Sequence, residues 1–114
     1  MDLVQITTTT DSADAARKIA DHLVDRRLAA CVQVTGPLVS TYRWKGSVER
    51  TDEFICLIKT RRELSGAVEE SIRSMHSYEN PEIVVTAIEG GSPDYVAWIE
   101  SETSAQVPRD LPSG

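Results

Sequence analysis

"EFICLIKT", residues 53–60, has the composition of a β-strand that is apolar on both faces. Side chains alternate along a strand, so Phe54 and Cys56 share one face while Ile55 and Leu57 share the other. A strand that borders water on one side normally alternates between apolar and polar residues. This stretch therefore predicts a strand at the centre of a sheet, covered on both sides.

The stretch "EIVVTAI", residues 82–88, shows the same two-sided apolar pattern. Apolar surface left in water costs about 25 cal/mol per Å², and a sandwich of one sheet and one helical layer covers only one face. We therefore expect a second copy of the chain to pack on the open face, which predicts a homo-oligomer. The alternative is that the last helix or the C-terminal tail covers that face.

The remaining segments predict the order β-α-β-β-β-α-β-α, in which two βαβ units surround a central hairpin strand, and this fits an α/β (α+β) fold of the β-α-β-β-α-β type with one more helix. Apolar residues at helical spacing predict helices after Ser12, over 64–75 and after Ser92, where Pro93 suits the first helical position. Short apolar runs predict strands over 3–10, 28–34, 38–44, 53–60 and 82–88, with Gly36-Pro37 as a break. This order is typical of a ferredoxin-like sandwich with an extra C-terminal helix. We expect one domain over residues 1–103 and a flexible tail over 104–114.

Composition excludes several classes of protein. The net charge of −6 and pI of about 4.8 argue against binding of nucleic acid, which needs a basic surface. No apolar run approaches the roughly 20 residues of a membrane span, and the N-terminus does not resemble a signal peptide. Cys31 and Cys56 lie in apolar runs without CxxC spacing, as free core thiols do, so a cytoplasmic location is expected. A disulfide between them, or a role as metal ligands, is the alternative.

The polar bend "SMHSYENPEI", residues 74–83, gathers the candidate site residues. An imidazole, a thioether, a phenol and two carboxylates are possible donors to a divalent cation such as copper or zinc. These donors belong to His76, Met75, Tyr78, Glu79 and Glu82. Other interpretations remain open: the imidazole can stabilise a helix end, and the carboxylates can be solvated or act as an acid–base pair. The spacing does not preform a metal site, because a tight one takes three or four ligands.

The sequence contains none of the motifs that are typical of an enzyme active site. The chain has no phosphate-binding glycine loop, and no serine or cysteine lies in the spacing of a nucleophile elbow. We therefore predict a protein that is not an enzyme. Lys59, at the end of an apolar strand, could bind an anion, although such a side chain more often extends into solvent.

Four segments together resemble the divalent-cation tolerance protein CutA family. They are "LVDRRLAACVQV" (23–34), "STYRWKGSVERTDEFICLIKT" (40–60), "IRSMHSYENPEI" (72–83) and "DYVAWI" (94–99). The resemblance implies a ferredoxin-like subunit in a compact homotrimer, related to the PII signalling proteins. It also implies a non-enzymatic role in tolerance of divalent metals, copper included, with His76 and Glu82 as the main candidate ligands.

The chain departs from the family's pattern at the bend. The family commonly has proline where this chain has Ser77 and an apolar residue where it has Asn80. Some members carry a first-strand cysteine as a proposed copper ligand, and Thr7 or a neighbouring threonine stands there in this chain. Loss of the soft thiolate weakens the case for tight copper binding. The alternative function is a PII-like module that binds a small anion between subunits, with Lys59, Arg43, Trp44 and Tyr78 around it.

Overall fold

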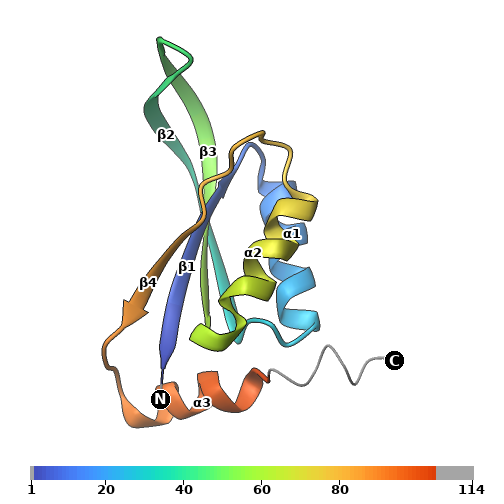
Figure 1. Cartoon of the computed structure of the whole chain (residues 1–114), viewed down its shortest axis with the longest axis vertical. Coiled ribbons are helices and arrows are strands. Elements are labelled where there is room, and N and C mark those ends of the chain that lie inside the picture. The colour runs from blue at the N-terminus through green and yellow to red at the C-terminus, as the bar shows by residue number, and fades with distance from the viewer. Residues whose placement is uncertain (1, 105–114) are drawn as a thin grey trace.

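A computed structural model describes residues 2–104, and the expected mixed α/β architecture is confirmed. A four-stranded antiparallel sheet has the strand order β2-β3-β1-β4 (Figure 1). The elements are β1 (Leu3–Thr10), α1 (Ala13–Asp25), β2 (Cys31–Trp44), β3 (Ser47–Arg61), a 3₁₀ turn (Arg62–Leu64), α2 (Ser65–Met75), β4 (Val84–Ile88) and α3 (Pro93–Glu102). The predicted tail lies outside the described residues from position 105 onward.

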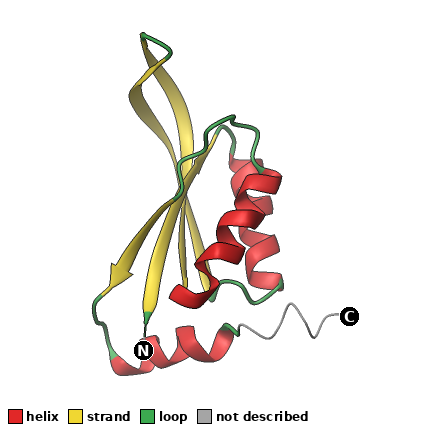
Figure 2. Ribbon diagram, in the orientation of Figure 1, coloured by secondary structure: helices red, strands yellow, loops and turns green. Residues whose placement is uncertain are grey.

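Helices α1 and α2 cover one face of the sheet (Figure 2). Helix α1 begins where Ser12 acts as N-cap, its Oγ accepting a hydrogen bond from the Ala15 amide at 3.0 Å. The apolar stripes of both helices pack on the sheet residues that point toward them, and this layer forms the main core. Its fully buried members include Ile6, Ile19, Leu23, Cys56, Ile58, Val68 and Ile72.

The long β2–β3 hairpin corrects the predicted strand boundaries. Residues 28–30 precede the strand, and the two runs predicted as separate strands join into one strand that passes through Gly36-Pro37. A register shift between Thr35 and Leu38 absorbs an extra residue, so the ladder with β3 continues on both sides. The polar residues 47–52, which precede the predicted strand, belong to β3 and pair with β2 because they lie directly opposite it across the turn.

Helix α3 covers one end of the second face of the sheet. Its residues Val96 and Ile99 pack with Leu3 and Ala30 in a smaller apolar cluster. Farther along this face coverage is incomplete, and Val84 keeps 47% of its surface exposed. The alternative in which the last helix covers the open face is therefore correct at one end of the sheet only.

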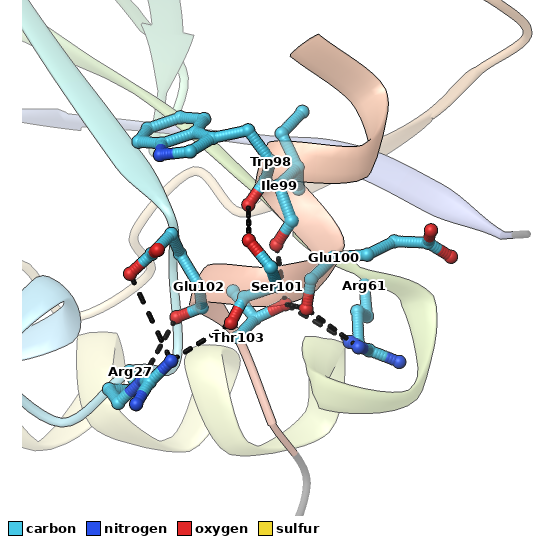
Figure 3. Close-up of polar contacts among 8 residues, drawn as sticks. All are labelled: Arg27, Arg61, Trp98, Ile99, Glu100, Ser101, Glu102 and Thr103. Atoms are coloured by element: carbon cyan, nitrogen blue, oxygen red, sulfur yellow. Dashed lines mark hydrogen bonds and ion pairs between the residues drawn. The ribbon is translucent and has the colours of Figure 1, made fainter. Parts of the chain in front are cut away.

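Two arginines bind the C-terminal end of α3, where carbonyl groups lack helical partners (Figure 3). Arg61 Nη2 donates to the Glu100 carbonyl at 2.6 Å, and Arg61 Nε donates to Thr103 Oγ1 at 3.1 Å. Arg27 Nη2 donates to the Ser101 carbonyl at 2.9 Å. Positive charge at this end also complements the helix dipole. The two guanidinium groups thus fasten α3 to the sheet and to the end of α1.

Candidate functional site

The imidazole of His76 fixes the polar bend to strand β1. The Tyr78 amide donates to His76 Nδ1 at 3.1 Å, so this nitrogen is an acceptor. His76 Nε2 lies 2.6 Å from the Thr9 carbonyl and must therefore carry the proton and donate. Both ring nitrogens are engaged by the backbone. A metal ion can reach either nitrogen only after one of these hydrogen bonds breaks.

A tyrosine–glutamate pair lies next to this imidazole. Tyr78 Oη donates to Glu53 Oε2 at 2.7 Å, and the Tyr78 ring lies 4.7 Å from the His76 ring, centroid to centroid. Burial, followed by the hydrogen bond to Glu53 and its charge, raises the pKa of Tyr78. The phenol therefore stays protonated and donates to the carboxylate at neutral pH.

Glu53 is the site residue that sequence reasoning missed. Only 6% of its surface is exposed, although it is a carboxylate on a central strand. A charged residue at the start of a run as apolar as residues 53–60 was the available signal, because buried acids are rare unless they have a partner. That partner, Tyr78, lies 25 positions away in sequence.

The bend and the hairpin enclose a cleft of about 770 Å³. The lining consists of Thr9, Glu53, residues 40–44 of β2, residues 77–80 and Glu82. The cleft thus joins the two predicted sets of site residues, because Arg43 and Trp44 face the same space as the bend residues Tyr78 and Glu79.

Several predicted residues lie elsewhere. Lys59 Nζ donates to Gln33 Oε1 at 2.6 Å and does not line the cleft. Met75, the last residue of α2, is 37% exposed and also lies outside the lining. Cys31 and Cys56 are free thiols. Burial raises the pKa of the Cys56 thiol to about 11, so the thiol is protonated at neutral pH.

The ammonium group of Lys45 lies at the rim of the cleft. Lys45 Nζ lies 5.4 Å from the centroid of the Trp44 ring and 3.8 Å from Glu79 Oε1. The Lys45 and Glu79 side chains are both well exposed, so this ion pair contributes little to stability. Its geometry nevertheless shows an ammonium group held between an aromatic ring and a carboxylate.

The donor atoms around the bend bear on whether a metal ion fits there. Within residues 2–104, no group of three or more His, Cys, Asp or Glu side chains is placed to hold a metal ion. The imidazole is engaged on both sides, and the Tyr78 phenol is committed to Glu53. The described residues of one chain therefore do not fit a tight mononuclear site, which needs three or four donors.

Comparison with known proteins decides the family. The model of the CutA1 divalent ion tolerance protein family matches residues 4–102. The chain belongs to this CutA1 family. A divalent-cation tolerance protein CutA of Thermus thermophilus is 39% identical over 95 residues, covering 83% of this chain and 92% of the relative. The crystal structure of CutA from Xylella fastidiosa superimposes with a TM-score of 0.88 at 36% identity, covering 91% of this chain and all of that one.

The CutA1 assignment supports a link to divalent metal ions at the level of the family, which is not a known family of enzymes. Mouse protein CutA is 39% identical over 90 residues, which cover 79% of this chain. The match covers 51% of the mouse protein, so the chain spans about half the length of that relative. Across residues 2–104, none of the helices has the length and apolar character to cross a membrane.

Proposed function

We propose that this chain is a non-enzymatic, homotrimeric protein of the cytoplasm that acts in tolerance of divalent metal ions, copper among them. Membership of the CutA1 family carries the proposal. The carboxylates Glu53, Glu79 and Glu82 around one cleft support it, since oxygen donors attract divalent cations. The two free thiols agree with a reducing compartment.

At the bend we propose a weak metal contact for copper or zinc. Glu82 and Glu79 are exposed and supply carboxylate oxygens, and His76 supplies a nitrogen released from one of its hydrogen bonds. Met75 and Tyr78 lie beside them in sequence as secondary donors. A tight site then needs further donors from another subunit, because one chain does not bring three together in its described part.

Calorimetric titration of copper and zinc chloride tests this contact. We expect His76→Ala and Glu82→Gln each to weaken copper binding at least tenfold, because each removes a donor from a site that has few. Glu89→Gln removes an exposed carboxylate outside the cleft and serves as the control, with unchanged affinity expected.

Urea unfolding of the same variants separates binding from folding. His76→Ala is expected to lower the free energy of unfolding by about 2 kcal/mol, because two hydrogen bonds to the backbone are lost. If this variant loses stability but keeps its affinity for copper, the imidazole only fixes the bend and is not a ligand.

The partly covered sheet face supports the proposed homotrimer. Val84, Tyr95 and Trp98 are each at least 40% exposed, which is unusual for large apolar side chains unless another surface covers them. Light scattering is expected to give three times the 12.6 kDa mass of one chain. A stable folded species with the mass of a single chain would contradict the assembly.

The cleft supports a second candidate function, a PII-like regulatory module that binds a small ligand between subunits. Its volume of about 770 Å³ suits a small organic molecule and exceeds the needs of a single ion. Arg43 and Trp44 line it, while Lys59 is engaged with Gln33 away from it. Calorimetric titration with small anions and small cations tests this function. The net charge of the residues that line the cleft indicates which of the two kinds of ligand binds.

A further inference from the structure

We propose that the cleft binds a small organic cation, with an ammonium group held by Glu53 and its carbon substituents packed on Tyr42 and Trp44. The proposal rests on the second candidate function, that of a ligand-binding module, and names the chemical class of its ligand. It replaces the small anion expected from the sequence with a ligand of opposite charge.

The buried carboxylate of Glu53 is the first reason. Glu53 lines the cleft with 6% of its surface exposed, and its Oε2 accepts the hydrogen bond from Tyr78. Within residues 2–104, the hydrogen bond from Tyr78 involves Oε2, and no Lys or Arg side chain forms an ion pair with Glu53. The second oxygen, Oε1, is not a buried atom that lacks a partner, so it stays accessible to a group that enters the cleft. A mostly buried carboxylate is stabilised when a positive charge approaches it. An ammonium group in the cleft supplies both a hydrogen-bond donor and the opposite charge.

The aromatic lining is the second reason. Tyr42, Trp44 and Tyr78 all line the cleft, and cations are attracted to the faces of such rings. The Lys45 ammonium group already lies 5.4 Å from the Trp44 ring centroid and 3.8 Å from a carboxylate oxygen of Glu79. The chain's own lysine therefore shows at the rim the combination of ring and carboxylate that we propose for the ligand.

The balance of charge is the third reason. Three carboxylates line the cleft, those of Glu53, Glu79 and Glu82, against the single guanidinium of Arg43. Lys45 at the rim offsets the Glu79 charge and forms its ion pair there, while Glu53 has the neutral donor Tyr78. An anionic ligand would be repelled by the net negative charge of this lining. A cation with an apolar portion matches both the charge and the aromatic walls.

Calorimetry on the full chain in its assembled state tests the proposal. The probes are butylammonium and tetramethylammonium chloride, with inorganic phosphate and zinc chloride as contrasts. We expect at least one ammonium probe to bind saturably and phosphate not to bind. Glu53→Gln is expected to weaken ammonium binding at least tenfold and Trp44→Leu at least threefold. Asp52→Asn, an exposed neutralisation on the same strand and outside the lining, is the matched control and should bind as the wild type does.

Each other outcome has a defined meaning. Absence of ammonium binding, or equal binding by Glu53→Gln, overturns the proposal. Binding of phosphate overturns the proposal, because the ligand of the cleft is then an anion, but it leaves the ligand-binding module standing. Zinc binding with no organic ligand overturns the module and leaves the role in metal tolerance standing. If Glu53→Gln fails to fold, Trp44→Leu decides, because the Trp44 ring is partly exposed at 37% and is not part of the core.

Discussion

Replacing Gly36 with alanine is expected to lower the free energy of unfolding by about 3 kcal/mol, because the residue stands where no side chain fits. Its φ of +149° disfavours any residue with a Cβ. The added Cβ would lie 2.8 Å from the Glu53 carbonyl oxygen and 2.7 Å from Cδ2 of Phe54. A backbone oxygen cannot move aside without shifting β3.

Chemical unfolding in urea, followed by tryptophan fluorescence, measures this effect. Gly66→Ala is the matched control, since Gly66 lies in α2 with nothing within 4 Å of its Cβ position. That change is expected to stabilise the protein by about 0.5–1 kcal/mol, as alanine favours the helix. Similar stability changes for the two variants would contradict the steric explanation. Because the added Cβ would press on the Glu53 backbone, the substitution should also disturb binding in the cleft.

Replacing Arg61 with methionine is expected to lower the free energy of unfolding by about 2–3 kcal/mol. The guanidinium donates charge-assisted hydrogen bonds to the Glu100 carbonyl and to Thr103 Oγ1, and both acceptors lose this charged donor. Methionine keeps much of the aliphatic stem, so the loss reports on the hydrogen bonds. In this variant, amide hydrogen exchange should speed up more in α3 than in α1, relative to the wild type.

Arg62→Met provides the control for charge and chain length. Arg62 forms an exposed ion pair with Asp2 at 2.9 Å, which solvent screens. We expect a change below about 1 kcal/mol, the usual range for exposed pairs. Equal losses in the two variants would show that α3 does not depend on its arginine contacts.

Much of the fold could be predicted because its signals are local. The helical stripe around Ile19 and Leu23 and the cap at Ser12 depend on neighbours within one or two turns. The strand boundaries around Gly36-Pro37 could not be predicted in this way. The continuity of β2 depends on its pairing with β3, and this pairing accommodates a register shift. Glycine and proline interrupt a strand locally, but they do not indicate whether its hydrogen-bonded pairing with a neighbouring strand continues beyond them.

The candidate site was only half predictable for a related reason. The donors of the bend are adjacent in sequence, so Tyr78, Glu79 and Glu82 were identified as a group. Whether their atoms are free to bind depends on distant segments, and the structure engages His76 with Thr9 and Tyr78 with Glu53. Glu53 itself becomes a site residue only through burial.

By itself, the sequence determined the class of fold and the family, since periodic patterns and spaced motifs are properties of the chain alone. The tertiary structure alone decided which side chains share a cleft and which hydrogen-bonding atoms are already in use. These properties arise from contacts between residues such as Glu53 and Tyr78, 25 positions apart, and from the burial that such contacts produce.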